Sequence, residues 1–559
     1  MAMGTAMVMA MEADRAGRRQ RRLLRPLRGI RFRPPAAVTP ARSAWRPFIA
    51  GIGCVALAAP ALADNWRITP SASISETYTT DANYTVGGNS TGDFITTVSG
   101  ALQINGAGAR ARLNGSVSAT GLFYAKETQN NSFAPSAILS GNIEAIEKFF
   151  FVDAQVNVSQ TFFSPFGPQP GNLVNATANR YTSQTYSISP YIQGRFGGTN
   201  ISYLVRDDNI WTLASQYGNT SVSDVPNTYL NQLDASMSSP AAPWGWKLEY
   251  AGTRYSPSDR DTFGKYTIQV GRVIAIYQYD PQIQISARGG YEKDEFPLTG
   301  SQDVIYGAGL QWFPSDRTQV SGYWEHRFFG SSYSAQIAHR LPRTALSLSF
   351  ARGLNTYPQN ALTIPAGVNV PTFVDAALTT RIPDPAERAL AVQQLIAQAG
   401  LPASLASPVN IFSGNVLLQT TLTAGAVLLG QRNSLAFNLY YTKSNAIAGT
   451  GSVLPPILQF GQNNTQKGGG VAFSHKLSGM TNFTAGATYS RTTSNDSVGN
   501  FAAAESNNYF AGAGITTQLG PKTSASFGVN YTKFSPTGEL DVTSSTNSFN
   551  VVAGVNHTF

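Results

Sequence analysis

The last eleven residues, 549–559, read FNVVAGVNHTF and place apolar and polar side chains on opposite faces of an extended chain. Phe549, Val551, Ala553, Val555, His557 and Phe559 share one of these faces. The same two-residue period recurs upstream, in 66–75, 111–120 and 150–159. This period is typical of β-strands that bury or shield one face only. The sequence from residue 64 onward therefore predicts a series of strands of about ten residues each.

The polar faces of these segments consist of Ser, Thr, Asn, Gln and Gly, with few charges. Tilted strands of about ten residues match the hydrocarbon thickness of a bilayer, and apolar-out, polar-in alternation is typical of transmembrane β-barrels. Connections alternate between short ones such as 520–522 and long polar ones such as 535–546. We therefore expect an all-β fold over 64–559: a single large antiparallel transmembrane β-barrel of about 22 strands, within 18 to 24, with an even count.

Composition agrees with this class of protein. Of the 559 residues 13% are charged, 42% are hydrophobic and 11% are aromatic, which argues against both a helical cytosolic enzyme and a disordered chain. A single cysteine excludes a disulfide scaffold. The formal net charge of +9 comes wholly from residues 1–63, where eleven Arg face two acids, so the rest of the chain is neutral. We expect no nucleic-acid partner.

Residues 1–63 are predicted to be a leader with a cleaved signal peptide. Arg42 and Arg46 precede a short apolar run at 47–57, and Ala61 and Ala63 form an A-x-A cleavage motif. Cleavage after Ala63 would start the mature chain at residue 64. The Arg-rich stretch 15–33 has two interpretations, a start codon assigned too far upstream or an extended cytoplasmic leader.

One region, 355–411, breaks the strand pattern. Within it Asp384 is a helix N-cap, followed by Pro at the first helical position and Glu387 at the third. We expect a short helix to about residue 399, with Asp384, Glu387, Arg388 and Gln394 at a constriction if the segment enters the lumen. The alternative is an external loop packed on its neighbours.

A set of charged residues is predicted to face the lumen as a polar strip. These residues are Arg206, Arg288, Glu325, Arg327, Arg340 and Arg352. One interpretation is a salt-bridge network that stiffens the wall. The other is a cationic path for a hydroxyl-rich or acidic polymer.

Catalytic and metal sites are not expected. The four histidines, His326, His339, His475 and His557, are scattered, and three of them fall on lipid-side positions. The chain has no H-E-x-x-H motif, no Gly-rich phosphate loop and no G-x-S-x-G elbow. We expect no cofactor and no enzymatic activity.

Two resemblances refine this prediction. A terminal strand that ends on Phe, with Phe549, Val551, Val555 and Phe559 on one face, resembles the signal read by the barrel assembly machinery. Several further stretches resemble the PEP-CTERM-system-associated outer-membrane protein family. They are NWRITPS at 65–71 with Tyr78 and DAN at 81–83, YGAGLQWFPS at 306–315, YWEHRFFG at 323–330, PDPAER at 383–388 and GQRNS at 430–434.

That family resemblance implies an outer-membrane component encoded with exopolysaccharide and exosortase-linked systems. The expected function is a bacterial outer-membrane channel for exopolysaccharide export. Its expected partners are outer-membrane lipid, the barrel assembly machinery, polysaccharide and export-system proteins. The alternatives are a general or nutrient-uptake porin, an outer-membrane enzyme that modifies lipid or glycan, and a plugged structural barrel that conducts nothing.

Overall fold

The computed structural model describes residues 66–218, 227–258, 265–296, 300–362, 370–379, 382, 388, 391–392, 396, 405–410, 416–447, 463–495, 504–537 and 545–559. The predicted leader, 1–63, with its cleavage residues Ala61 and Ala63, lies outside the described residues. So do Asp384, Glu387 and Gln394 of the predicted constriction.

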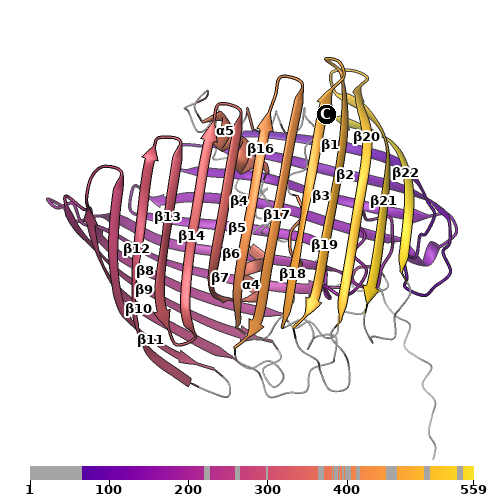
Figure 1. Ribbon diagram of the computed structural model, residues 1–559. Coiled ribbons are helices and arrows are strands. Elements are labelled where there is room, and N and C mark those ends of the chain that lie inside the picture. The colour runs from indigo at the N-terminus through magenta and orange to yellow at the C-terminus, as the bar shows by residue number, and fades with distance from the viewer. Residues whose placement is uncertain are drawn as a thin grey trace, which may run out of the picture. The chain divides into compact units, whose positions relative to one another are not determined.

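Strands dominate the described chain (Figure 1). They are β1 (Trp66–Thr79), β2 (Asp93–Ala107), β3 (Ala111–Tyr124), β4 (Ser132–Ile146), β5 (Phe150–Phe162), β6 (Arg180–Arg195), β7 (Ser202–Ser215), β8 (Thr228–Ser239), β9 (Trp244–Pro257), β10 (Tyr266–Gln278), β11 (Ile283–Glu295), β12 (Gly300–Ser315), β13 (Thr318–Arg327), β14 (Gly330–Leu341), β15 (Thr344–Asn355), β16 (Leu417–Leu429), β17 (Asn433–Ala446), β18 (Asn464–Lys476), β19 (Thr481–Ser494), β20 (Glu505–Gln518), β21 (Thr523–Thr537) and β22 (Thr546–Thr558). The helical elements are η2 (Thr128–Asn130), α4 (Tyr357–Leu362) and α5 (Val370–Leu378).

The 22 strands form one closed sheet. Each strand pairs antiparallel with the next along the chain, and β1 also pairs antiparallel with β22, from Ser71 opposite Thr558 to Thr79 opposite Asn550. This last pairing removes both sheet edges, so the ladder hydrogen bonds continue around the whole circumference. The predicted all-β barrel with about 22 strands is confirmed.

The two ends of the barrel differ in their connections. Turns such as 316–317, 342–343 and 519–522 join strands at the end where the chain's C-terminus lies, at the top of Figure 1. The opposite end carries the longer connections, including 80–92, 163–179 and 356–416, although β13 and β14 are joined there by 328–329 alone. Short turns are periplasmic in bacterial barrels, so we call these the periplasmic end and the external end.

The outer face of the wall is apolar. Phe549, Val555 and Phe559 of the terminal segment are 44%, 43% and 62% exposed, and Val551 shares their side of the strand. Aromatic pairs lie near strand ends, such as Tyr78 with Phe94 at a ring distance of 5.1 Å. An apolar outer band with aromatics at its margins is what lipid contact requires.

The described helices of the interruption after β15 lie against the inner wall. We call residues 356–416 the insertion. Its helix α5 packs on β14, β15 and β16, whereas α4 packs on β5 to β8, farther around the barrel. Only one helix was expected here, and α4 and α5 are additional. In α5 the buried residues Val370, Val374 and Leu378 recur at helical spacing and face the wall. Arg388, Val392 and Ile396 of the predicted helix are helical.

Across the described residues, no helix combines the length and the apolar character that crossing a membrane would need.

Candidate functional site

The centre of the inner wall on β10 to β13 holds a charge cluster, which we define as Arg272, Arg288, Glu292, Glu325 and Arg327. Glu325 is 1% exposed and accepts two bonds from Arg272, Nη2 to Oε1 at 2.7 Å and Nε to Oε2 at 3.1 Å. Arg288 Nη1 lies 3.5 Å from Glu325 Oε2, and its guanidinium lies 4.3 Å from the centre of the Tyr323 ring. One carboxylate therefore holds two guanidinium groups against the wall.

Two glycines allow the side chain of Arg272 to extend along the wall to Glu325. Arg272 on β10 and Glu325 on β13 are separated by β11 and β12, and Gly290 and Gly307 occupy the inner positions between them. A Cβ at Gly307 would lie 2.1 Å from the Trp324 carbonyl oxygen, and one at Gly290 would lie 2.2 Å from the Gly271 carbonyl oxygen. Any side chain at either glycine would therefore displace the backbone of the wall and fill the space that the arginines cross.

A second ion pair lies nearer the external end. Arg327 donates Nη2 and Nε to Glu292 Oε2 at 2.6 and 2.9 Å, and the Phe328 backbone N–H donates to Glu292 Oε1 at 2.7 Å. Asp294, two residues along β11, accepts one bond, from Ser301 at 3.1 Å. Four of the five cluster charges thus compensate one another within hydrogen-bond distance, and Arg288 remains the excess cation.

The other predicted strip residues lie apart from this cluster. Arg206 faces inward on β7 and bonds Asp153 at 2.6 Å and Asp208 at 2.8 Å. Arg340 faces inward at the periplasmic end, where Nη2 donates to the Asp316 carbonyl at 2.8 Å. The predicted strip is therefore three separate groups rather than one continuous path.

The expectation for Arg352 is wrong. It pairs across strands with Tyr333, and it continues the outward series of Leu348 and Phe350 on β15. Its guanidinium donates to the Ser331 carbonyl near the external rim. An arginine at this height can lie along the apolar wall and still reach the membrane surface with its charged end.

The helix α5 packs on an apolar patch of the inner wall, which we call the seat of α5 and define as Ala345, Val427 and Ala436. Val370 and Val374 are fully buried, and they pack with Ala345, Val427 and Ala436 of the inner wall. These inward positions would be polar in a water-filled barrel. Arg388 ties the following segment to α5, because its Nε donates to Asp375 Oδ1 at 2.8 Å. The charge of Arg388 therefore serves a contact within the insertion.

The helix α4 crosses to the far side of the lumen. The hydroxyls of Tyr357 and Tyr181 on β6 lie 2.8 Å apart. Asn157 Nδ2 donates to the Ala361 carbonyl at 3.1 Å, and Gln359 Nε2 donates to Gln232 Oε1 at 2.9 Å. Since the insertion leaves the wall at β15, these bonds show that it spans the lumen.

A second segment, 163–179, also folds inward, and we call it the inner loop. It leaves the wall between β5 and β6 but bonds side chains on β20 to β22 and β1. Asn172 Nδ2 donates to Asn530 Oδ1 at 3.2 Å. The fully buried Asn175 donates to Thr79 Oγ1 at 3.1 Å and to Ser548 Oγ at 3.0 Å. The external half of the lumen is thus bridged twice, by the inner loop and by the insertion.

An acid and a phenol in the connection 80–92 support the inner loop. Burial raises the pKa of Asp81, against hydrogen bonds from Thr546 and from the Tyr84 backbone N–H. Burial also raises the pKa of Tyr84 to about 12, and its hydroxyl lies 3.2 Å from Thr532 Oγ1. The Ala82 carbonyl accepts from the Ala176 N–H at 2.8 Å, which joins this connection to the inner loop.

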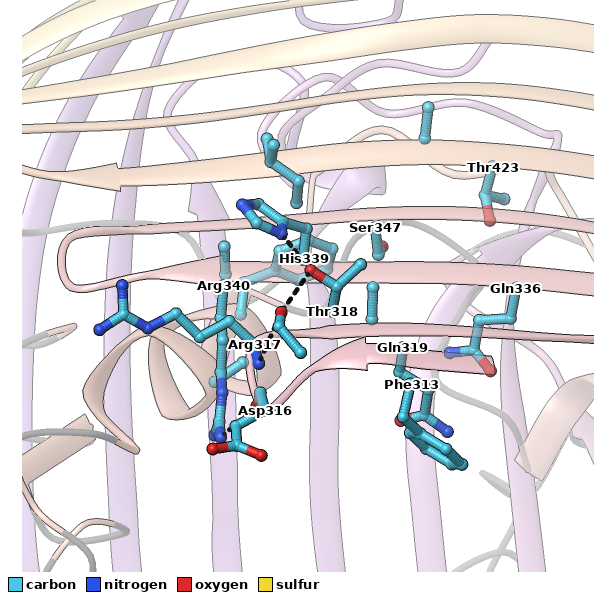
Figure 2. Close-up of a pocket in the computed structure, with 17 residues that line it drawn as sticks. Phe313, Asp316, Arg317, Thr318, Gln319, Gln336, His339, Arg340, Ser347 and Thr423 are labelled. Atoms are coloured by element: carbon cyan, nitrogen blue, oxygen red, sulfur yellow. Dashed lines mark hydrogen bonds between the residues drawn. The ribbon is translucent and has the colours of Figure 1, made fainter. Parts of the chain in front are cut away.

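At the periplasmic end a cavity of about 750 Å³ remains between the wall and α5. Figure 2 shows Arg317 and Arg340 at one end of it and Phe313, Gln319 and Gln336 farther along. Phe373 of α5 also lines the cavity. Amides, guanidinium groups and aromatic rings suit hydroxyl-rich ligands, because they combine hydrogen bonds with flat apolar surface.

The histidines lie on the lipid side of the wall, and His339 also borders the periplasmic cavity at its rim. All four share the outward side of their strands, with His326 on the Tyr306 ring at 5.0 Å. His339 Nδ1 bonds Thr318 Oγ1 at 2.9 Å, as Figure 2 shows, and His557 Nδ1 bonds Thr523 Oγ1 at 2.8 Å. In the described part of the chain no three His, Cys, Asp or Glu residues gather as a metal site would require.

Sequence reasoning missed Arg272 and Asn175. Arg272 shares its side of β10 with Ile268, Val270 and Ile274, so an inward side of the strand reads as apolar. Asn175 lies in a polar connection with no strand period. A signal existed for the second, since 163–179 is long for a loop between strands and carries three Pro and three Asn.

Taken together, the closed antiparallel sheet, the apolar outer wall and the polar, partly filled interior define the chain as an outer-membrane-type β-barrel. No protein-family model and no curated protein matches the sequence. The resemblance to the PEP-CTERM-associated family therefore stays a prediction.

Solved structures with a similar fold include several outer-membrane proteins. A mutant of the ferric enterobactin receptor PfeA from Pseudomonas aeruginosa is 9% identical, with 88% of this chain and 80% of that chain covered and a TM-score of 0.42. The FrpB iron transporter from Neisseria meningitidis is 10% identical, with 89% and 82% covered and a TM-score of 0.42. OccAB1 from Acinetobacter baumannii is 10% identical, with 88% and 97% covered and a TM-score of 0.32.

Proposed function

We propose that the chain is a bacterial outer-membrane channel that exports a hydroxyl-rich polymer, an exopolysaccharide, through a lumen constricted by the inner loop and the insertion. The observation that carries this proposal is the compensation of charge inside the wall. Glu325 and Glu292 are bonded to arginines, and Arg206 is bonded to two aspartates. A wall with little net charge favours neutral or weakly charged cargo, for which hydroxyl contacts suffice.

The remaining surface of the lumen supports the same cargo. The cavity at the periplasmic end offers Gln319, Gln336, Phe313 and Phe373, which suit sugar hydroxyls and sugar faces. Each such contact is weak in water, so a chain can advance from one contact to the next. The inner loop and the insertion then serve as the constriction that holds back other periplasmic solutes.

The decisive experiment is deletion of the gene followed by measurement of polysaccharide at the cell surface and in the periplasm. Export through this channel predicts polymer trapped in the periplasm and its release when the intact gene is restored. Normal secretion in the deletion strain would contradict the proposal.

A second candidate is a general or nutrient-uptake porin, which the cavity of about 750 Å³ would favour because it suits small solutes. The two functions differ in a swelling assay with reconstituted vesicles. A porin predicts uptake of mono- and disaccharides by the unaltered protein. A polymer channel that its inner loop and insertion hold shut predicts little uptake until those segments are loosened.

A further inference from the structure

The outer wall carries a polar cluster on β7 to β9, which we define as Asp207, Asn209, Tyr229, Asn231 and Arg254. Asp207 pairs with Leu233 and Asn209 with Asn231, in the same outward rows as Val205 and Trp211. Asn231 in turn pairs with Arg254. Arg206 and Asp208, the neighbours of Asp207 along the strand, are the ones that face the lumen. The cluster therefore lies on the lipid side.

Its members bond one another. The two oxygens of Asp207 accept from Asn231 Nδ2 at 2.6 Å and from Asn209 Nδ2 at 2.9 Å. Tyr229 donates its hydroxyl to Asn209 Oδ1 at 2.6 Å. Among the described residues, neither Asp207 nor Arg254 forms an ion pair. The carboxylate is held by amides alone, and the same amides also reach the Asp207 carbonyl at 3.4 Å and Asn209 Oδ1 at 3.3 Å.

The position of Asp207 along the membrane normal makes this cluster unusual. It lies midway along β7 between two outward aromatics, four residues after Tyr203 and four before Trp211. Those rings contact Phe196 at 5.0 Å and Tyr229 at 5.5 Å, as girdle residues do. A carboxylate midway between girdles lies in the hydrocarbon band, where ionisable side chains are rare and mark a functional contact. Across the barrel, Ala485, Ala511 and Val529 occupy the equivalent outer wall.

The surroundings of the cluster allow close approach by another wall. Ala235 and Gly252 lie outward next to Leu233, so little side chain projects there. Small residues allow two transmembrane surfaces to meet. The ladder between β6 and β7 also skips Ser189 and Pro190, opposite Asp208 and Asp207, where proline lacks a donor. The Asp207 carbonyl accepts there from Asn209 Nδ2 at 3.4 Å.

We propose that this outer face of β7 to β9 is the contact surface for a second copy of the same chain in the membrane. A two-fold contact places the same patch on both sides and needs a self-complementary surface. The amides of Asn209 and Asn231 provide donors and acceptors together. Asp207 and Arg254 give the patch one anion and one cation, so two copies do not repel. This inference is independent of the cargo.

Cross-linking in intact outer membranes tests the proposal. Leu233→Cys places a thiol beside the cluster, and Leu102→Cys on β2 is a matched control, since the two leucines are 37% and 42% exposed on the outer wall. A short bis-maleimide should convert the Leu233→Cys chain to a dimer band. Leu102→Cys and the unaltered chain, whose one cysteine lies in the predicted signal peptide, should stay monomeric. Absence of the Leu233→Cys dimer, or an equal band from Leu102→Cys, would overturn the proposal.

A second set of variants tests the cluster itself. Asp207→Leu with Asn231→Leu in the Leu233→Cys chain should abolish the dimer, while the gel shift on heating still reports a folded barrel, because leucine suits the lipid face. Glu76→Leu removes another outward carboxylate, bonded to Thr96 at 2.7 Å, and should leave the dimer intact. A dimer that survives the double substitution, or a cross-linked band whose mass identifies a different protein, would refute a second copy as the occupant.

Discussion

Replacement of Glu325 by Gln should cost the barrel a large part of its stability. Glu325 is 1% exposed and neutralises Arg272 and Arg288, whose side chains are 15% and 14% exposed. Glutamine keeps the shape but leaves two guanidinium groups buried without an anion. Loss of one partner of a buried ion pair costs about 3 to 5 kcal/mol. We expect the free energy of unfolding to fall by that amount.

The assay is equilibrium unfolding in guanidinium chloride of protein folded into phospholipid vesicles, followed by tryptophan fluorescence. Glu505→Gln is the matched control, because its bond to Arg491 is also 2.6 to 2.7 Å long but the two side chains are 26% and 38% exposed. That substitution should cost about 0.2 to 1 kcal/mol. Arg272→Gln added to Glu325→Gln should recover part of the loss, since one uncompensated charge is then removed.

Equal small losses in the two single variants would refute the argument that the wall glycines create a dry, paired cluster. Such a result would mean that water reaches Glu325 and screens its interaction with Arg272 and Arg288. Full additivity of the Arg272 and Glu325 substitutions would refute the direct contact between them.

Three other predictions concern the segments in the lumen. Tyr357→Phe removes the bond to Tyr181, worth about 1 kcal/mol, and should raise the open fraction of single channels in planar bilayers about fivefold; an unchanged open fraction would contradict the role of α4. Val374→Asp buries a carboxylate in the seat of α5 and should raise the conductance further, whereas Thr379→Asp, in the turn after α5 and outside that seat, should not. Asp81→Asn tests pH dependence: because burial raises the pKa of Asp81 when the chain is folded, its protonation favours folding, and this contribution is present at acidic pH and is lost as the pH rises through the raised value. Relative to Asp81→Asn, unfolding midpoints of the unaltered chain should therefore increase as the pH is lowered from 7 toward 4; parallel pH profiles of the two proteins would show that Asp81 is not the group responsible.

The barrel was predictable because its outer wall contacts a uniform solvent. In each strand the outward residues contact lipid, as Phe527, Val529 and Tyr531 of β21 do. Apolar side chains therefore recur at every second position, and this period predicts where the strands lie and how many there are. The alternation of short and long connections supported an even strand count. The inward placement of Glu325 and Arg327 followed from the same period.

The interior was less predictable because it does not meet a uniform solvent. Ile268 and Val270 face inward and are apolar, since they pack in one cluster with Val416 of the insertion. The period alone cannot distinguish this face from a lipid face. Arg272 was therefore overlooked. Arg352 was assigned to the polar face of its segment, although it continues the outward series of Leu348 and Phe350. Near a rim, charge is a weak guide to side, because a long side chain reaches water from either face.

The contacts of the inner loop depend on residues more than 300 positions away, such as Asn172 with Asn530. No local pattern encodes such a pairing, because both asparagines suit water as well as each other. The same is true of Tyr181 and Tyr357, whose hydroxyls meet only once the barrel has closed. The fold class can therefore be predicted from the two-residue period of the sequence. The contacts that constrict the lumen cannot, because they form only when the barrel closes.

The central claim is a wall with lipid on one side and a polar lumen on the other, and site-directed spin labelling along β21 tests it most directly. Labels placed one at a time from Phe527 to Thr532 in vesicles should alternate, with 527, 529 and 531 accessible to oxygen dissolved in lipid and 528, 530 and 532 shielded from it. A uniform profile along the strand, or a period near 3.6 residues, would contradict the barrel and with it the proposed channel.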